Sequence, residues 1–463
     1  MRSNRRVLVA AAVFAAALAA LTVGAASATA QGGKAPPSSG KAGGHAENDS
    51  ARASRLQGAS ATGVECPPGL DCQFLPAAYA QNSADAGDYG NYDLANRPDD
   101  GLAIRYVVVH DTEVPYDPTL AEFQNPHAYA SAHYVIRSSD GFVTQMVPTK
   151  DVAWHAGNWY VNTHSVGIEN EGFALDLANW FTPDLYHSLA RLTRYQAERY
   201  GIPLDRAHII GHDQVPGPSS PYQAGMHWDP GPYFNWAHFM ALVGAPITPS
   251  GNAGTDPVVT IDPRWATNQP PVTGCGDGTE ACPQQPANFV YLHTAPSADS
   301  PLLSDPYLAD AGVEPGGAGT TLAWDWGDKA ATGEQYAVAG RSGNWLAIWF
   351  GGQKAWLYDP QGASAATIPG SGTLITPKAG LASIPVYGAA YPSSYSTATL
   401  DKYSIPAGQT YVAKELVTAD HYHATLFDDP SSYYVETSPE QFYEIFFNHR
   451  IAYVRADDVD VLH

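Results

Sequence analysis

The sequence predicts an α/β domain followed by two small all-β modules, and three observations lead to this expectation. Strand-like and helix-like segments alternate between residues 104 and 244. From Asn288 onward, short aromatic and β-branched runs lie between Gly, Pro, Ser and Asp, with little helical periodicity. Within this second part, residues 348–357 align with residues 445–454 at a constant offset of 97, which indicates two copies of one module.

The composition limits the class of protein. The chain has 463 residues, with 46 Asp or Glu against 24 Lys or Arg and a formal net charge of −22. This charge excludes a nucleic-acid-binding protein, which needs a basic face. Hydrophobic residues make up 44% of the chain, so most of it should fold, and at about 150 residues per domain the length suits two or three domains. The oligomeric state stays open.

The first thirty residues are predicted to be a secretory signal peptide. Three arginines precede an almost unbroken apolar run at 7–23, and Ala28-Thr29-Ala30 has the small-residue pattern that signal peptidase reads. An uncleaved anchor is the alternative, although the run is shorter than the about 20 residues that span a bilayer. We expect a secreted protein with no transmembrane segment after cleavage.

The first expected element of the α/β domain is a buried strand at 104–109, because its residues are apolar and mostly β-branched. A short helix begins with Asp117 as N-cap and Pro118 in its first turn. The next two strands, 132–137 and 142–147, are joined by a Ser-Ser-Asp-Gly turn and should form a hairpin.

Four further elements complete this domain. Residues 165–171 read as a strand, and residues 182–201 read as a helix that begins at a threonine N-cap and stops at a glycine. A short strand at 207–211 and a helix at 233–243 with one apolar face follow. Helices interleaved with strands therefore indicate an α/β fold.

Composition also suggests where each segment begins and ends. Gly, Ser, Ala and Pro dominate the region after the signal peptide, and Pro, Gly, Thr and Asp dominate the region after the α/β part. The expected segments are a signal peptide, a flexible N-terminal region, the α/β domain, a linker, a β module, a second linker and a second β module: 1–30, 31–79, 80–245, 246–287, 288–360, 361–380 and 381–463.

Four cysteines form two close pairs: Cys66 with Cys72, and Cys275 with Cys282. Each pair encloses glycines, so we expect two local disulfides in an oxidising compartment. Crossed pairing and free buried thiols are alternatives. A zinc ribbon is another, although neither pair has the two-residue spacing that such a site normally shows.

Three residues in the α/β part have the character of metal ligands. His110 follows the first strand, His212 follows the strand at 207–211, and Asp229 lies in a Pro- and Gly-rich loop. Two imidazoles and one carboxylate leave a fourth position open, which is typical of catalytic zinc. His208 is a weaker candidate, because residues four apart in a strand lie too far from each other to share one ion.

Six motifs of this part resemble, in the same order, those of the zinc-dependent N-acetylmuramoyl-L-alanine amidases of the amidase-2 family, relatives of peptidoglycan recognition proteins. The motifs are VVVHDT at 107–112, SAHYVI at 131–136, WHAG at 154–157, VGIENEG at 166–172, GHD at 211–213 and HWDPGP at 227–232. The resemblance implies a mixed sheet flanked by helices. It also implies hydrolysis of the amide between N-acetylmuramic acid and L-alanine of the peptidoglycan stem peptide.

The resemblance implies roles for individual residues. It makes His110, His212 and Asp229 the ligands of one Zn²⁺ per chain, and Glu169 the general base. Glu171 is the alternative base, because residues two apart in a strand share a face.

His227 stands where the family often has a Lys or Thr that polarises the scissile carbonyl, so it is expected to stabilise the oxyanion. The expected substrate contacts are Trp154, His155 and His133.

The repeated segments at 348–357 and 445–454 resemble the end of a bacterial SH3-like domain, with an aromatic run, a polar turn and an aromatic and aliphatic return. We expect these modules to bind the cell wall, and a chain ending near Pro249 to keep activity on a small soluble substrate. A spacer role is the alternative.

The expected function is thus that of a secreted peptidoglycan hydrolase, extracellular or associated with the cell wall, with peptidoglycan as its partner. A non-catalytic recognition protein is one alternative, although such proteins typically lack a zinc ligand that this sequence keeps. A zinc hydrolase of another amide is the second alternative.

Overall fold

The computed structural model describes residues 63–176, 180–252, 256–395 and 398–462. The predicted signal peptide and most of the flexible region predicted at 31–79 lie outside these residues. Among the described helices, none combines the length and the apolar character that a membrane crossing requires.

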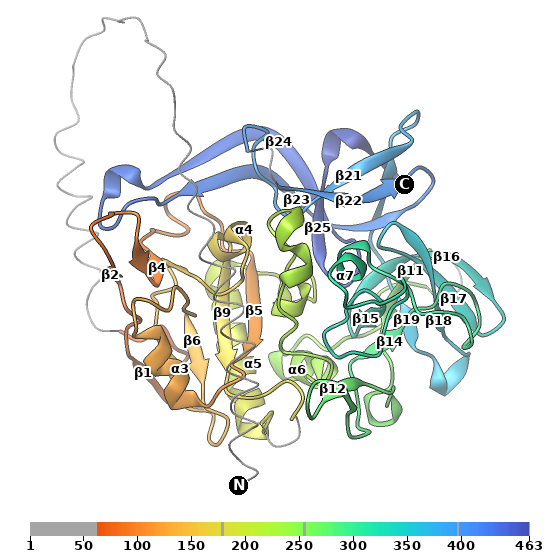
Figure 1. Cartoon of the computed structure of the whole chain (residues 1–463), viewed down its shortest axis with the longest axis horizontal. Coiled ribbons are helices and arrows are strands. Elements are labelled where there is room, and N and C mark those ends of the chain that lie inside the picture. The colour runs from red at the N-terminus through yellow and green to blue at the C-terminus, as the bar shows by residue number, and fades with distance from the viewer. Residues whose placement is uncertain (1–62, 177–179, 253–255, 396–397, 463) are drawn as a thin grey trace, which may run out of the picture.

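The α/β domain is built on a six-stranded sheet with the order β1-β7-β6-β9-β5-β10 (Figure 1). Its strands are β1 Cys72–Phe74, β5 Tyr106–Asp111, β6 Tyr134–Ile136, β7 Val143–Gln145, β9 Ser165–Asn170 and β10 Ile209–Gly211. β6 and β7 pair antiparallel, whereas the other neighbouring pairs are parallel. The expected mixed sheet is confirmed, including the predicted hairpin.

Four helices pack around this sheet: α3 Tyr116–Phe123, α4 Trp159–Thr163, α5 Pro183–Tyr200 and α6 Trp236–Val243. Both predicted ends of α5 are confirmed, because the Thr182 side chain accepts a hydrogen bond from the Leu185 N–H at 3.2 Å and Gly201 ends the helix with a φ of 71°. α5 and α6 share one hydrophobic cluster with Val107 and Val109 of β5. This cluster is the core on one face of the sheet.

Two helices begin at residues other than those predicted. α3 starts at Tyr116, whose N–H donates to Glu171 Oε1 at 2.9 Å, so the predicted Asp117 cap is not used. α6 starts at Trp236 rather than at residue 233, because the Asn235 side chain caps it by accepting from the His238 N–H at 3.0 Å.

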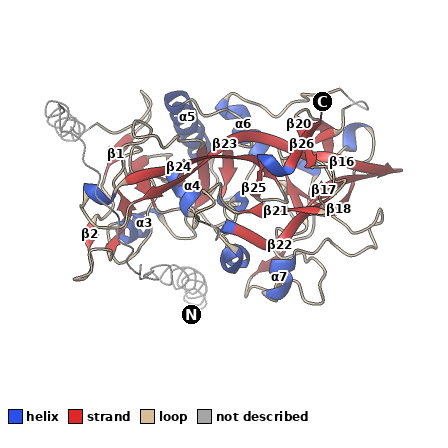
Figure 2. Ribbon diagram, turned by 90° about the horizontal axis from the view of Figure 1, so that it is seen from above, coloured by secondary structure: helices blue, strands red, loops and turns tan. Residues whose placement is uncertain are grey.

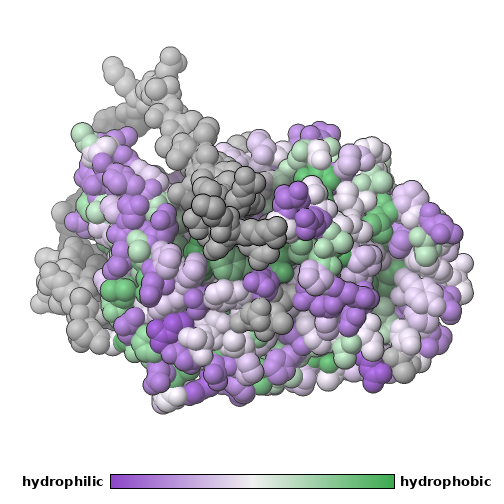
Figure 3. Space-filling view, turned by 60° about the horizontal axis from the view of Figure 1, so that its bottom comes forward, coloured by the Kyte–Doolittle hydropathy of each residue, from purple (hydrophilic) through white to green (hydrophobic). Residues whose placement is uncertain are grey.

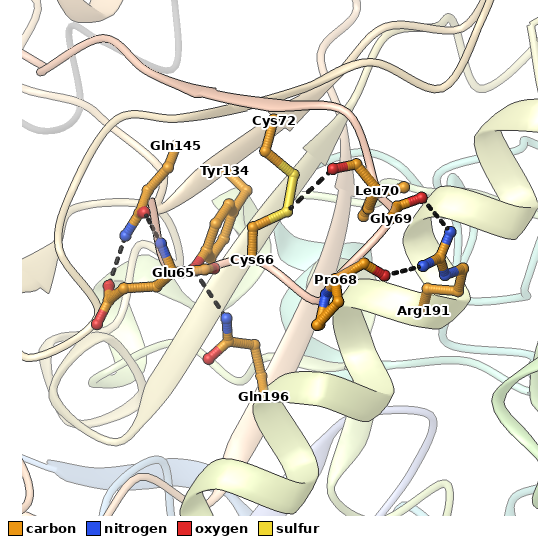
Figure 4. Close-up of a disulfide and its surroundings, with 10 residues drawn as sticks. All are labelled: Glu65, Cys66, Pro68, Gly69, Leu70, Cys72, Tyr134, Gln145, Arg191 and Gln196. Atoms are coloured by element: carbon orange, nitrogen blue, oxygen red, sulfur yellow. Dashed lines mark hydrogen bonds between the residues drawn. A yellow bond between two sulfur atoms is a disulfide. The ribbon is translucent and has the colours of Figure 1, made fainter. Parts of the chain in front are cut away.

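The described start of the N-terminal region is ordered, which corrects the expectation of flexibility for residues 63–79. The predicted disulfide between Cys66 and Cys72 closes a loop beside the sheet (Figure 4), and β1 then pairs with β7. Arg191 of α5 donates to the carbonyl oxygens of Pro68 at 2.6 Å and Gly69 at 2.9 Å. The loop is thus fixed to both the sheet and α5.

The second part of the chain is mostly β-strands, as expected. One sheet has the order β18-β17-β16-β11-β19, and the other has the order β22-β21-β25-β24-β23-β20-β26. The strands of the first are β11 Val258–Ile261, β16 Gln335–Ser342, β17 Trp345–Phe350, β18 Gln353–Tyr358 and β19 Thr367–Pro369. Those of the second are β20 Thr373–Pro377, β21 Ser383–Tyr387, β22 Thr399–Pro406, β23 Tyr411–His423, β24 Tyr434–Phe446, β25 Ile451–Arg455 and β26 Val459–Leu462.

Smaller elements connect these sheets. They are β2 Ala80–Gln81, β3 Tyr89–Gly90, β4 Tyr92–Asp93, β8 Val152–Ala153, β12 Thr273–Cys275, β13 Glu280–Ala281, β14 Phe289–Tyr291, β15 Lys329–Ala331 and the short helix α7 Pro306–Asp310. The predicted disulfide between Cys275 and Cys282 links the β12–β13 pair.

Both predicted linkers contribute strands to the sheets. β11 lies within 246–287 and pairs with β16 and β19. β19 and β20 lie within 361–380, and β20 pairs with β23 and β26. Their partners are distant in sequence, so local composition did not reveal these pairings.

The repeated segment is a β-hairpin in both copies. Ile348 of β17 pairs with Ala355 of β18, and Ile445 of β24 pairs with Ala452 of β25. These two pairs are related by the same offset of 97 residues that the sequence shows, so the register of the hairpin is also repeated.

One hydrophobic cluster unites the two parts of the chain. It contains Tyr106 and Val108 of β5 and Tyr160 of α4, together with Phe350 of β17 and Tyr453 of β25. The long hairpin of β23 and β24 also extends over the α/β domain, where β23 contacts α4 (Figures 1 and 2). The two parts therefore form one continuous core rather than separate bodies.

This shared core changes the expectation for a truncated chain. A chain ending near Pro249 would expose the apolar side chains of β5 and α4 to water, at a cost of about 25 cal/mol per Å² of apolar surface. Such a fragment is therefore expected to lose its fold and its activity. Functional tests need the full chain.

Buried polar groups join the same two parts. The Tyr106 hydroxyl bonds to the Glu444 carboxylate and lies 3.0 Å from the Tyr453 hydroxyl. His164 Nε2 lies 2.9 Å from Asp420 Oδ1 of β23. Because both members of each pair are buried, the loss of one member would leave the other without a partner, at a typical cost of about 1–3 kcal/mol.

Large exposed hydrophobic side chains are scattered over the described surface: Phe74, Tyr222, Tyr358, Leu381, Leu416, Leu426, Tyr434 and Leu462. On the face shown in Figure 3, hydrophilic residues surround small hydrophobic areas. This is the ordinary pattern of a protein surface in water.

His208 supplies a pH-dependent contact between the two parts. Its Nδ1 lies 2.7 Å from Asp205 Oδ1, and its Nε2 lies 3.8 Å from Glu415 Oε2 of β23. Burial alone would lower the pKa of His208, but these two carboxylates raise it to about 10. The folded-state pKa is thus above the ordinary value of about 6.5 in an unfolded chain. The contribution of His208 to the free energy of unfolding is complete below its pKa in the unfolded chain. This contribution is lost as the pH rises through its pKa in the folded protein.

We therefore expect the difference in the free energy of unfolding between the wild type and His208→Gln to be larger at about pH 6 than above about pH 10. Urea unfolding at both pH values measures this difference. His187→Gln, at an exposed position of α5, is the control and should show no such dependence. An equal difference at both pH values would exclude a charged His208 in the folded state.

Candidate metal centre

The structure brings the three predicted ligands together at one edge of the sheet. His110 lies at the end of β5, and His212 directly follows β10, which pairs in parallel with β5. Asp229 reaches the same place from the loop that precedes α6. One potential ligand atom from each residue lies within 4.8 Å of those from the other two, and all three residues are buried.

Asp229 faces both imidazoles. Its Oδ2 lies 3.2 Å from His110 Nδ1, and its Oδ1 lies 3.1 Å from His212 Nδ1. The two imidazole rings have their centroids 4.5 Å apart. The three side chains therefore converge with the Nδ1 atoms directed at the carboxylate.

Burial and neighbouring groups shift the pKa values of His212 and Asp229. It lowers the pKa of His212 to about 3, so that imidazole is neutral and keeps a lone pair at ordinary pH. Burial alone would raise the pKa of Asp229, but the surrounding imidazoles, His212 foremost, hold it well below its usual value. A neutral imidazole and an ionised carboxylate are the forms that bind metal ions.

A chain of hydrogen bonds behind His110 orients its ring. The Ser165 hydroxyl donates to the Val161 carbonyl at 2.6 Å, so it can only accept from His155 Nε2, which lies 3.0 Å away. His155 Nδ1 then carries a lone pair and accepts from His110 Nε2 at 3.0 Å. Burial lowers the pKa of His155 well below its usual value, in agreement with a neutral ring. With its Nε2 bonded to His155, His110 turns its Nδ1 toward Asp229.

Gly167 makes room for this arrangement. It lies in the middle of β9, where a Cβ atom would stand 2.5 Å from His155 Cγ, far closer than real contacts allow. Any side chain at this position would displace His155 and, through it, His110.

The structure separates the two glutamates that the sequence left open. Glu169 of β9 is the register partner of His110, and its Oε1 lies 3.9 Å from His110 Nδ1. Its Oε2 is buried and has no hydrogen-bond partner among the described residues. Both carboxylate oxygens of Glu171 accept hydrogen bonds, one from the backbone N–H group of Tyr116 at 2.9 Å and one from that of Ser138 at 2.8 Å.

Burial and the nearby Asp229 carboxylate raise the pKa of Glu169 well above its usual value. A carboxyl group of this kind holds a proton more readily than an exposed one.

His227 lies at the open side of the cluster. Its ring stacks on His212 with centroids 4.5 Å apart, and its Nδ1 lies 3.5 Å from Asp229 Oδ1. With 41% of its side chain exposed, it is far more accessible than the three ligand candidates. It is therefore the most accessible imidazole beside the three ligand candidates.

Two of the three predicted substrate contacts, His133 and His155, are buried and bonded to other side chains. His133 is completely buried, with Nδ1 accepting from the Gly167 N–H at 3.0 Å and Nε2 lying 3.0 Å from Arg97. His155 stands behind His110 in the hydrogen-bond chain described above. Neither position can be recognised as buried from local sequence alone.

Trp154 is half-buried, and its indole N–H donates to Asp93 Oδ2 at 2.6 Å. His208 lies outside the ligand cluster, as expected for the weaker candidate. Sequence reasoning missed Ser165, which orients His155, because nothing distinguishes it from any other serine at the start of a strand.

The comparisons with known proteins concern this part of the chain. Residues 100–232 match the family described as N-acetylmuramoyl-L-alanine amidase. N-acetylmuramoyl-L-alanine amidase A of Achromobacter lyticus is 36% identical over 153 residues, which are 30% of this chain and 81% of that protein. The 1,6-anhydro-N-acetylmuramyl-L-alanine amidase AmpD of Escherichia coli is 34% identical over 177 residues, which are 33% of this chain and 88% of that protein.

Among solved structures, the crystal structure of a selenomethionine derivative of AmpD is 29% identical, with a TM-score of 0.29. The match covers 39% of this chain and 97% of that one. The sequence matches alone span most of both curated amidases at more than 30% identity. The chain therefore belongs to the N-acetylmuramoyl-L-alanine amidase family.

Proposed function

We propose that this protein is a peptidoglycan hydrolase that cleaves the amide bond between N-acetylmuramic acid and L-alanine of the stem peptide, with one zinc ion as its cofactor. The observation that carries the proposal is the convergence of His110, His212 and Asp229 beside Glu169, whose buried Oε2 has no hydrogen-bond partner among the described residues. The family membership and the names of the two curated relatives support the choice of substrate.

The donor set fits zinc. Two imidazoles and one carboxylate are a set found in zinc hydrolases that keep a position open for the reaction. The hydrogen bond from His110 to His155 turns His110 Nδ1 toward a carboxylate oxygen of Asp229, 3.2 Å away. The donor atoms of all three residues thus point at one place, which supports a metal ion there.

We expect one ion per chain. Among the described residues, these three side chains are the one group of three or more His, Cys, Asp or Glu whose donor atoms meet closely enough.

When bound, zinc supplies Lewis-acid chemistry, because it polarises a carbonyl group and acidifies water. Glu169 takes a proton from the attacking water and passes it to the departing nitrogen of L-alanine. The exposed His227 donates a hydrogen bond to the carbonyl oxygen as negative charge develops there. Water adds to the carbonyl carbon and the carbon–nitrogen bond breaks, which leaves a carboxyl group on the lactyl side and a free amino group on L-alanine.

We further propose that the protein is secreted after cleavage of residues 1–30 and acts outside the cell or at the cell wall. The segments 288–360 and 381–463 are proposed to be SH3-like modules that contact peptidoglycan. The repeated hairpin, with its conserved register, supports a common origin of the two modules.

Incubation of the full-length protein with purified sacculi tests the activity. Mass spectrometry of the released material should show muramic acid with a free lactyl carboxyl group and peptides that begin with L-alanine. Cleavage at a different bond would replace the substrate assignment, and binding without any cleavage would favour a recognition protein.

His110→Ala should lose zinc, because it removes one of the three proposed donors. Elemental analysis of the purified protein measures the content. His187→Ala, which changes an exposed histidine on α5, should keep one zinc ion per chain. Full zinc occupancy in His110→Ala would remove His110 from the ligand set.

Glu169→Gln should keep zinc but lose about 10²–10⁴-fold in kcat on a soluble muramyl peptide, since an amide cannot take up the proton. Glu171→Gln is the matched comparison and should mainly lower the melting temperature, because it weakens the contacts to the N–H groups of Tyr116 and Ser138. The reverse pattern, with kcat lost in Glu171→Gln and kept in Glu169→Gln, would transfer the role of base to Glu171.

A further inference from the structure

The segment that carries His227 and Asp229 is held by residues from the C-terminal half of the chain. Arg450 follows β24 and donates from its two terminal nitrogens to backbone carbonyls of the α/β domain. One nitrogen bonds the Val215 oxygen at 2.6 Å, and the other bonds the His227 oxygen at 3.0 Å and the Met226 oxygen at 3.4 Å. One side chain thus joins the end of the His212 turn to the start of the Asp229 loop.

Asn288 holds the other end of the same loop. Its backbone N–H donates to the Pro232 oxygen at 2.8 Å, and its side-chain amide donates to the oxygens of Gly231 and Phe234, both at 3.0 Å. Asn288 is completely buried. The loop at 226–234, which we call the metal-ligand loop, is therefore bonded on both sides of Asp229 by residues outside the α/β domain.

A third residue supports the turn next to His212. His449 Nε2 lies 3.5 Å from Asp213 Oδ2, and its ring stacks on Trp326 with centroids 3.9 Å apart. The Asp213 N–H in turn donates to the Asp229 carbonyl at 2.7 Å. The His212 turn and the metal-ligand loop are thus braced together from one side.

The two copies of the repeated hairpin differ at the residues that make these contacts. The turn of the second copy contains Asn448, His449 and Arg450, where the first copy has Gly-Gly-Gln at 351–353. The first turn packs against the second module instead, because the Gly351 N–H donates to the Phe447 carbonyl at 2.6 Å. The two hairpins therefore share a register but make different contacts. The second hairpin contacts the segments that carry the metal-ligand candidates.

We propose that Arg450 and Asn288 are positioning residues of the metal centre, which hold the metal-ligand loop so that Asp229 and His227 face His110 and His212. The C-terminal half is then a structural part of the amidase site as well as a candidate for wall contact. This inference rests on the proposed function for its catalytic consequence, but not for its consequence on metal binding.

The test uses the full-length chain with Arg450→Gln, which installs the residue of the first copy, and Arg450→Lys, which keeps the charge and at least one donor. Arg455→Gln is the matched control, because Arg455 ends β25, the strand that directly follows Arg450, and its ion-pair partner is Glu440 of β24 rather than the metal-ligand loop. Zinc affinity is measured by competition with a chelator. Backbone hydrogen exchange of residues 226–234 is measured in the metal-free protein, and kcat and KM are measured on a soluble muramyl peptide.

Arg450→Gln should weaken zinc binding by about 10- to 100-fold, the usual effect of losing a residue that supports metal ligands. It should also speed exchange within 226–234 and lower kcat more than it raises KM, with partial recovery in Arg450→Lys and none of these changes in Arg455→Gln. Asn288→Ala should act in the same direction and replaces Arg450→Gln if that variant does not fold.

Zinc affinity and loop exchange equal to the wild type in folded Arg450→Gln or Asn288→Ala would overturn the inference. A wild-type protein that binds zinc but cleaves no muramyl amide would overturn the proposed function alone, because the zinc and exchange measurements would still decide the role of Arg450.

Discussion

The packing of strand β5 between two hydrophobic cores is the constraint on which the rest of the structure depends. Val107 and Val109 face the core formed with α5 and α6, whereas Tyr106 and Val108 face the core shared with the C-terminal sheets. Because alternate residues of a strand point to opposite faces, His110 lies on the same face as Tyr106 and Val108. The position of the first ligand candidate therefore depends on both parts of the chain, and neither part can be regarded as an appendage of the other.

The chemistry of the site follows from the same burial. Removal from water lowers the pKa of His212 and raises that of Glu169, because in both cases it disfavours the charged form. Burial thus favours a neutral imidazole, which is the form that binds a metal ion. It also favours a carboxyl group that can hold a proton. Asp229 is the exception, since the imidazoles around it outweigh its burial and keep it ionised.

Local signals predicted the parts of this structure that depend on neighbouring residues. The ends of α5, the β6–β7 hairpin and the ligand candidates at strand ends all follow from residues within a few positions of each other. Pairings between distant strands were not predicted. β11 and β20 pair with strands far away in the sequence, whereas both segments were predicted to be linkers. The roles of Glu169 and Glu171 could not be separated by strand alternation, because the difference lies in the N–H groups that Glu171 meets across the fold.

The ordered connections change what the C-terminal half can contribute on an insoluble substrate. A module on a flexible tether raises the local concentration of an enzyme without fixing its orientation. β11 and β19, which lie in the two predicted linkers, pair with each other in one sheet. Arg450 also bonds the loop that carries Asp229. The C-terminal half therefore keeps a constant position relative to His227. A formal net charge of −22 gives no long-range attraction to an anionic wall, so the wall contact proposed above would have to come from shape and short-range hydrogen bonds. Under that proposal, a bound glycan strand would meet the metal centre in one orientation, which would favour stem peptides at defined positions over those reached by random collision.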